Sequence, residues 1–194
     1  MNVTAAVKTS FKVDLARLLK DVQQIIEKYP LSESVRQICL TSHKLTEQTV
    51  FDGVGSLYDF QKSAFWAEEK DFKYFMSEFQ GTYLEEIYRD LQILSENKIA
   101  RVRLMYLPPR ACYSFHYDKT KRYHISLFTN PASFLIFKNE APIHIPPDGY
   151  VYEIDTRDWH TAVNCGHNPR IHLVLSLAND STDDQLFKAK TPVF

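Results

Sequence analysis

The second half of the chain reads as a series of short strands, and this pattern restricts the fold more than any other feature. After Lys98, apolar and polar residues alternate in short runs, as they do on strands with one buried face. Turn-forming residues such as Pro108-Pro109 and Asn130-Pro131 separate the runs. The eight runs are 100–107, 112–116, 123–128, 134–137, 142–145, 150–154, 161–164 and 171–177. This number and spacing of strands predicts a double-sheet jelly roll.

The first 99 residues have a predominantly helical pattern. In 14–28, apolar residues recur at every third or fourth position, which is typical of a helix with one buried face. Asp14 is suited to cap this helix, and Pro30 ends it. The segment 37–41 reads as a short strand. A second helical region is predicted over 69–97, with a break at Gly81.

We therefore predict one α+β domain over 1–194 with three parts. Residues 1–99 form a mostly helical support that packs on one sheet. Residues 100–177 form the jelly-roll core. Residues 178–194 form a C-terminal tail.

Composition and charge exclude several function classes. The chain has 24 acidic and 23 basic residues, and a net charge of −1 does not favour binding to nucleic acid or anionic membranes. It contains no apolar run of about 18 residues, no secretory signal and no glycine-rich phosphate-binding motif. Its three cysteines are too few and too widely spaced for a disulfide framework. We expect a cytoplasmic protein without nucleic-acid or membrane partners, and its oligomeric state stays open.

Histidines are concentrated in the strand-rich half, where six of the seven lie between His116 and His172. His116 and Asp118 are two residues apart at the end of a predicted strand, so both side chains point to one face. His160 stands at the start of a later strand. Two imidazoles and one carboxylate are the ligand set of non-haem Fe(II) oxygenases. We predict His116, Asp118 and His160 as metal ligands and as the catalytic centre.

Two arginine-containing pairs accompany these ligands. Arg170 lies on the last predicted strand, and an arginine directed into an apolar barrel needs an anionic partner. A dicarboxylate cosubstrate such as 2-oxoglutarate would supply that partner. A structural ion pair with Asp155 or Asp158 is the alternative. Arg122 and His124 share one strand face and are candidates to bind the other carboxylate of the cosubstrate.

The order of these motifs resembles the aspartyl/asparaginyl β-hydroxylase family, which includes free-proline hydroxylases. The resemblance covers about residues 100–177. Its motifs are HxD at 116–118, RxHxxLxTNP at 122–131, DG-aromatic at 148–150, HxxxN at 160–164 and RxHLV at 170–174. The resemblance implies a double-stranded β-helix that uses Fe(II) and 2-oxoglutarate to hydroxylate its substrate, with succinate and carbon dioxide as co-products.

The resemblance also implies roles for single residues. His116, Asp118 and His160 match the iron ligands. Arg170 matches the residue that binds the distal carboxylate of 2-oxoglutarate, and Arg122 and His124 match the pair near its C1 carboxylate. A family serine on the first core strand has no clear counterpart here, and Tyr106 is our candidate to provide that hydroxyl. Asn164 matches a position that braces the turn after the second histidine ligand.

The substrate stays open, because residues 1–99 match none of the better-known family members. It is either a free amino acid or a residue within a peptide or protein. Segment 51–65 and Trp159 are candidates to line the substrate pocket, and the segment is either a lid or a buried aromatic cluster. The alternative function is a non-catalytic, cupin-like protein that binds a metal or a small acid. Halogenation is disfavoured, because Asp118 fills the position that a halide needs.

Overall fold

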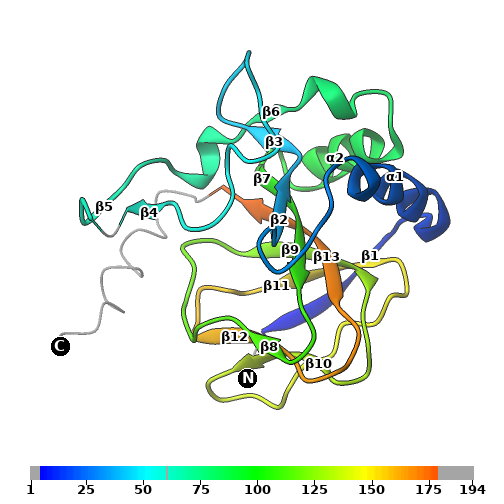
Figure 1. Ribbon diagram of the computed structural model, residues 1–194, viewed down its shortest axis with the longest axis vertical. Coiled ribbons are helices and arrows are strands. Elements are labelled where there is room, and N and C mark those ends of the chain that lie inside the picture. Colours follow the sequence, from blue (N-terminus) through cyan, green and yellow to red (C-terminus); the bar gives the residue numbers. More distant parts are fainter. Residues whose placement is uncertain (1–4, 60, 179–194) are drawn as a thin grey trace.

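Two antiparallel sheets face each other in the computed structural model, which describes residues 5–59 and 61–178 (Figure 1). The larger sheet has the strand order β1-β11-β9-β13-β7-β2, and the smaller sheet has the order β10-β12-β8. The larger sheet consists of β1 (Ala6–Lys12), β2 (Gln37–Cys39), β7 (Ile99–Leu107), β9 (Arg122–Phe128), β11 (Tyr150–Ile154) and β13 (Arg170–Leu177). The smaller sheet consists of β8 (Ala111–Cys112), β10 (Ser133–Phe137) and β12 (His160–Asn164). This is the jelly-roll arrangement predicted from the strand pattern.

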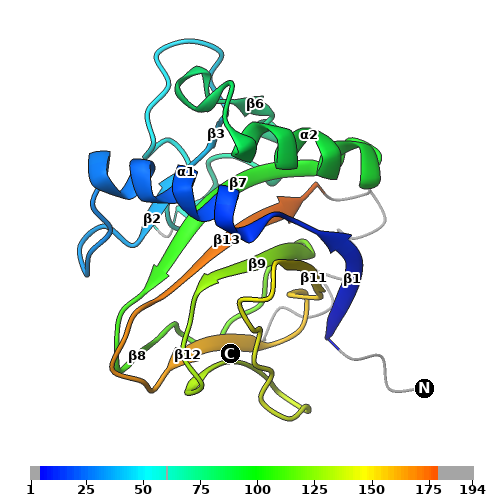
Figure 2. The ribbon, with the colours of Figure 1, turned by 90° about the vertical axis from the view of Figure 1, so that its right-hand side faces the viewer.

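Helices α1 (Leu15–Lys28) and α2 (Tyr83–Leu94) lie across the outer face of the larger sheet (Figure 2). Asp14 caps α1 as predicted, because its carboxylate accepts hydrogen bonds from the first-turn N–H groups. Both helices bury apolar residues against the sheet, and each fully buried side chain of this kind stabilises the fold by about 1.5–3 kcal/mol. The buried helical residues are Leu18, Val22, Ile25, Leu84, Ile87 and Leu91.

The prediction of helix over residues 69–81 is wrong. The chain there forms two short 3₁₀ turns, η1 (Glu69–Asp71) and η2 (Ser77–Phe79), with the short strand β6 (Tyr74–Phe75) between them. Strand β6 pairs with β3 (Thr41–Ser42), so pairing between distant segments overrides the local periodicity. Helix α2 ends at Leu94, three residues before the predicted end, and the chain then turns through two residues with positive φ, Glu96 and Asn97.

The first 99 residues also supply both edge strands of the larger sheet. Strand β1, which the sequence pattern did not reveal, pairs with β11, and β2 pairs with β7. A further hairpin joins β4 (Tyr58–Asp59) to β5 (Ala64–Phe65). The predicted strand at 142–145 is reduced to one bridge between Ile143 and Leu135. Of the predicted tail, 178–194, only Ala178 lies within the described residues.

The sheets enclose a second apolar cluster beneath the helix-facing core. It includes Leu107, Leu135, Phe137, Ile154 and Ala162. In the part of the chain that the structure describes, neither helix has the length and apolarity needed to cross a bilayer.

Candidate active site

A cavity of about 930 Å³ lies between the two sheets. The larger sheet forms one side of the cavity with the inward-facing residues of β7, β9 and β13, and the smaller sheet contributes Leu135, His160 and Ala162. The residues from the larger sheet are Arg101, Arg103, Met105, Leu107, Arg122, His124, Arg170 and Val174. The cavity is therefore basic on one side, and this charge pattern is unusual for a site between packed sheets.

The three predicted metal ligands meet in this cavity. The backbones of His116 and His160 form an isolated antiparallel bridge with N–H···O distances of 2.9 and 2.7 Å. This pairing brings the imidazole ring centroids to 4.5 Å from each other. Asp118 follows two residues later, and the candidate ligand atoms of all three residues lie within 4.8 Å of one another. The three ligand residues, which are separated along the chain, thus form one compact cluster.

Hydrogen bonds set the orientation of both imidazoles. Nδ1 of His116 lies 2.7 Å from the carbonyl oxygen of Ser114, and Nδ1 of His160 lies 2.9 Å from that of Asp158. A carbonyl oxygen only accepts, so each Nδ1 carries the proton and each neutral ring keeps its lone pair at Nε2. Burial lowers the pKa of His160, which favours this neutral form. Both Nε2 atoms face Asp118, at 3.9 Å from Oδ1 for His116 and 3.5 Å from Oδ2 for His160.

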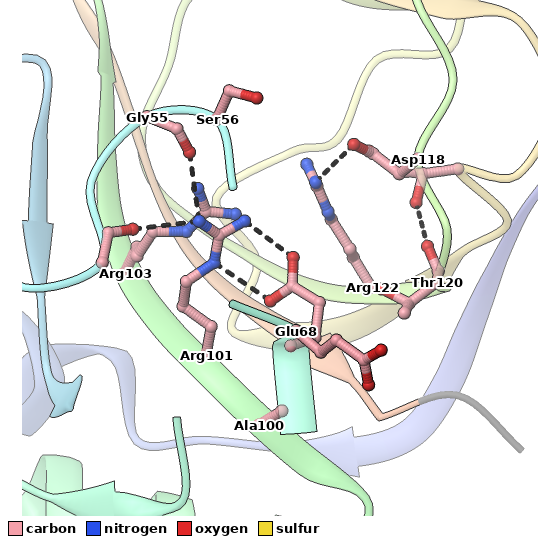
Figure 3. Close-up of polar contacts among 12 residues, drawn as sticks. Gly55, Ser56, Glu68, Ala100, Arg101, Arg103, Asp118, Thr120 and Arg122 are labelled. Atoms are coloured by element: carbon pink, nitrogen blue, oxygen red, sulfur yellow. Dashed lines mark hydrogen bonds and ion pairs between the residues drawn. The ribbon is translucent and has the colours of Figure 1, made fainter. Parts of the chain in front are cut away.

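The two oxygens of Asp118 have different surroundings. Oδ1 forms a 2.6 Å ion pair with Nη2 of Arg122, whereas Oδ2 is buried and has no hydrogen-bond partner among the described residues (Figure 3). Burial alone would raise the pKa of Asp118, but the charge of Arg122 outweighs it and lowers the pKa. An ionised, buried and unpartnered oxygen beside two Nε2 lone pairs fits a divalent metal ion. The donor set of two nitrogens and one oxygen is the one that non-haem iron prefers.

Arg170 lies in the same cavity without a carboxylate partner. Its Nε and Nη2 atoms each lie 3.0 Å from a ring nitrogen of His172, and its Nη1 has no partner among the described residues. Asp155, one of the two alternative partners, forms its ion pair with Arg157 at 2.8 Å. No contact in the described chain joins Arg170 to Asp158. The alternative role of Arg170, a structural ion pair with one of these aspartates, is therefore not found among the described residues, and its buried side chain lines the cavity.

His124 is the third basic group near the metal-ligand cluster. Its Nε2 is buried and unpartnered among the described residues, and its Nδ1 lies 3.4 Å from Nδ1 of His172. Burial and the nearby charges of Arg170 and Arg122 lower the pKa of His124 well below its usual range. A neutral His124 lined up beside two guanidinium groups is suited to hydrogen-bond an anion rather than to add a charge.

The structure does not bring Tyr106 to the cavity. Strand β7 directs Met105 and Leu107 into the cavity, and by strand alternation Tyr106 points to the opposite face, where it packs against the core under the helices. Tyr113 is one of the hydroxyl-bearing residues that do line the cavity, and it donates a 3.3 Å hydrogen bond to the carbonyl oxygen of Tyr106. The other six predicted site residues all reach the cavity or its metal-ligand cluster.

Two arginines of β7 that were not among the predicted site residues also line the cavity. Arg101 and Arg103 alternate along the predicted strand in phase with Met105, and this phase was the available signal. Arg101 is satisfied, because it forms an ion pair with Glu69 at 2.7 Å and donates to the carbonyl oxygens of Gly53 and Gly55. Arg103 has no carboxylate partner among the described residues.

The predicted substrate-lining segment does contact the cavity. Residues 55–58 and Phe65 line it, together with Trp159, Tyr113 and Tyr117. Phe115 stacks on Trp159 at 5.7 Å between ring centroids, and Tyr117 meets the same indole edge-on at 5.0 Å. Aromatic rings therefore lie next to the metal ligands along the chain, since Trp159 precedes His160 and Tyr117 stands between His116 and Asp118.

The chain was compared with known proteins and solved structures. The structure of EvdMO1 matches with a TM-score of 0.53 and 15% identity, over 91% of this chain and 48% of that one. A prolyl-4-hydroxylase from Pseudomonas putida matches with a TM-score of 0.49 and 11% identity, over 91% and 94% of the two chains. A 2OG-Fe(II) oxygenase family oxidoreductase from Burkholderia pseudomallei matches with a TM-score of 0.35 and 17% identity, over 41% and 43%. No family model and no curated protein sequence matches the chain.

The predicted fold class is therefore confirmed: the chain is a double-stranded β-helix with two supporting helices. Its cavity contains a cluster of two histidines and one aspartate. The narrower resemblance to the aspartyl/asparaginyl β-hydroxylase family stays a prediction.

Proposed function

We propose that this protein is an Fe(II)- and 2-oxoglutarate-dependent dioxygenase that hydroxylates an amino acid, either free or within a peptide or protein. One observation carries the proposal. Asp118, whose Oδ2 is unpartnered among the described residues, meets His116 and His160 in the cavity that also contains the unpartnered Nη1 of Arg170. A metal ion and a dicarboxylate would satisfy these groups together.

The three ligand residues would hold the iron through Nε2 of His116, Nε2 of His160 and Oδ2 of Asp118. When bound, iron and 2-oxoglutarate supply the oxidising chemistry that converts a C–H bond of the substrate to an alcohol, with succinate and carbon dioxide as co-products. The carbonyl oxygens of Ser114 and Asp158 keep each imidazole in the ligating tautomer.

The basic side of the cavity would bind the cosubstrate. Arg170 presents its unpartnered Nη1 to a carboxylate, while His172 fixes the plane of the guanidinium. His124 offers its unpartnered Nε2 to the second carboxylate, nearer to the metal ligands. Arg122 would lie near the same carboxylate, as the resemblance implies, while its Nη2 holds Oδ1 of Asp118. Its unpartnered Nε leaves it one further hydrogen bond to donate.

The test is formation of succinate from 2-oxoglutarate by the purified protein with Fe(II) and oxygen. The substrates supplied are the free amino acids and a peptide library, and products that gain one oxygen atom are detected by mass spectrometry. We expect iron-dependent succinate formation that is abolished by His116→Ala and by Asp118→Ala. His167→Ala is the matched control, because His167 is exposed and does not line the cavity.

Absence of iron-dependent succinate formation across these substrates would contradict the proposal. Retention of Zn(II) by the same three residues without any turnover would instead indicate the alternative function, a cupin-like protein that binds a metal or a small acid.

A further inference from the structure

Arg103 is a buried cation without an anionic partner. It lies on β7 with 2% of its surface exposed and lines the cavity. Its Nη1 donates a 3.0 Å hydrogen bond to Oε1 of Gln37, while its Nε and Nη2 have no partner among the described residues. Burial and the like charges of Arg101 and Arg122 lower the pKa of Arg103 to about 9, so it is still charged at neutral pH. A buried guanidinium with two unused donors is costly unless a ligand satisfies it.

The neighbouring carboxylates are already engaged by other arginines. Glu69 forms a two-bond ion pair with Arg101, with distances of 3.0 and 2.7 Å, and Asp118 pairs with Arg122 at 2.6 Å. Figure 3 shows Arg101, Asp118 and Arg122 in the same view as Arg103. Because 2-oxoglutarate would engage Arg170 and the metal-ligand cluster, it leaves the charge of Arg103 without a counterpart.

The position of Arg103 separates it from the cosubstrate groups while keeping it in the same cavity. Arg103 is opposite Val174 on β13, and Val174 is opposite His124 on β9. Residues in such a row share a sheet face, and two strand spacings of about 4.8 Å place the backbones of Arg103 and His124 roughly 10 Å apart. Arg103 therefore faces the cavity beside the cosubstrate position rather than within it.

We propose that Arg103 binds a carboxylate of the substrate, and that the substrate is a small free acid such as an amino acid with an unblocked α-carboxylate. This inference rests on the proposed function and narrows its substrate class. A guanidinium with two adjacent free donors, Nε and Nη2, matches the two oxygens of one carboxylate.

The enclosure of Arg103 favours a small molecule over a residue within a folded protein. Gly55 passes over this part of the cavity and donates a 3.0 Å hydrogen bond to the same Gln37 oxygen that accepts from Arg103. The cavity of about 930 Å³ is within the range of small-molecule sites and has room for a cosubstrate and a small acid. Gln37 is therefore a positioning residue that joins Arg103 to the Gly55 segment.

The experiment compares each free L-amino acid with its carboxamide. For aspartate and glutamate, both carboxylates are amidated. Binding is measured by calorimetry under anaerobic conditions to protein saturated with Fe(II) and 2-oxoglutarate. We expect at least one acid to bind and its carboxamide to bind about 10- to 100-fold more weakly, the range expected for losing a charged hydrogen-bonded pair. Arg103→Gln should weaken binding of the acid by a similar factor. Arg89→Gln, on the exposed face of α2, should leave that binding unchanged.

Gln37→Glu is the second variant and covers the case in which Arg103→Gln fails to fold. Its carboxylate keeps both hydrogen bonds of Gln37 and neutralises Arg103 from within the protein. We expect unchanged or raised thermal stability together with weakened acid binding. If Arg103 had only a structural role, Gln37→Glu would leave thermal stability unchanged or raise it without weakening binding of the acid.

The inference is overturned if no acid of the panel binds, if acids and carboxamides bind alike, or if both variants bind the acid as the wild type does. The visible charge-transfer band of the Fe(II)–2-oxoglutarate complex is recorded in the same samples. An intact band with any of these outcomes refutes only the role of Arg103, whereas a missing band refutes the proposed function and this inference with it.

Discussion

Asp118 and Arg122 form a 2.6 Å ion pair that engages one oxygen of the carboxylate and leaves the other without a hydrogen-bond partner among the described residues. The pair is four residues apart in the chain and buried in the cavity beside His116 and His160. Arg122 thus orients the acidic ligand, and the free oxygen lies 3.5 Å from Nε2 of His160. An outer contact of this kind fixes the direction of a metal ligand and keeps it ionised.

Arg122→Leu should weaken metal binding by about 10- to 100-fold, as the loss of an outer-shell partner typically does. The physical reason is that Asp118 loses the charge that lowers its pKa, so protons compete better with the metal. Competition between the protein and a chromophoric Zn(II) chelator measures this affinity. Lys121→Leu is the control, because Lys121 pairs with Glu153 at 2.7 Å and does not line the cavity. Equal effects of the two variants would contradict the assigned role.

Arg170→Gln should raise the concentration of 2-oxoglutarate needed for half-saturation by about 10- to 100-fold, because a charged hydrogen-bonded pair is lost. Anaerobic titration of the Fe(II)-loaded protein measures this shift. Metal affinity should stay the same, since Arg170 does not contact the three ligands. Arg110→Gln serves as the control, because the exposed Arg110 contacts His167 outside the cavity. Unchanged cosubstrate affinity in Arg170→Gln would exclude this guanidinium as the anion site.

Asn164 braces the turn that follows the second histidine ligand, as the resemblance implied. Its Nδ2 donates to the carbonyl oxygens of Leu107, Pro108 and Asn168, and its Oδ1 accepts from Asn130. Asn164→Ala should lower the free energy of unfolding by about 2–4 kcal/mol, because several buried groups lose their partners. Denaturant unfolding measures this loss. Asn168→Ala keeps the backbone acceptor and should change stability little, so a loss of similar size there would contradict the account.

Asp52 should make stability depend on pH in the acidic range. Burial alone would raise the pKa of Asp52, but hydrogen bonds from Thr49, Ser42 and Lys44 lower it to about 2. The unfolded chain has a pKa of about 3.9 at this residue, so the stabilisation is complete above that value and is lost as pH falls through about 2.

Asp52→Asn tests this dependence by denaturant unfolding at several pH values. The wild type should be the more stable protein at pH 7, and its advantage should shrink between about pH 4 and pH 2. Asp90→Asn, on the exposed face of α2, provides the comparison for a general effect of charge. An advantage that is the same at every pH would show that the Asp52 charge does not contribute.

Much of the fold was predictable because short apolar runs separated by turn-forming residues mark the core strands, of which β7, β9 and β13 are buried along most of their length. Strands β7, β9, β11 and β13 lie within a residue of their predicted bounds. Strand β1 was missed because it lies at an edge, where AVKTSFK buries little and its pairing with β11 joins segments about 145 residues apart. The helix predicted over 69–81 failed for a related reason, since the pairing of β6 with β3 depends on distant residues.

The parts of the site that depend on the spacing of residues along the chain were predictable. The parts that depend on the exact face of a strand, or on which groups lack an ion-pair partner, were not. His116 and Asp118 share a face because they are two residues apart, and Arg170 is in phase with the cavity. Tyr106 was assigned to the wrong face, because a shift of one residue reverses the direction of a strand side chain. Arg103 was overlooked because its significance comes from the absence of a carboxylate near it among the described residues.

The most direct test of the central claim is an anaerobic titration of the protein with Fe(II) and then with 2-oxoglutarate, followed by visible absorption. We expect a metal-to-ligand charge-transfer band that saturates at one equivalent of each, is absent in His160→Ala and persists in His144→Ala, a residue outside the cavity. A wild-type protein that develops no band, or a band that survives loss of His160, would contradict the assignment of this cluster as an iron and 2-oxoglutarate site.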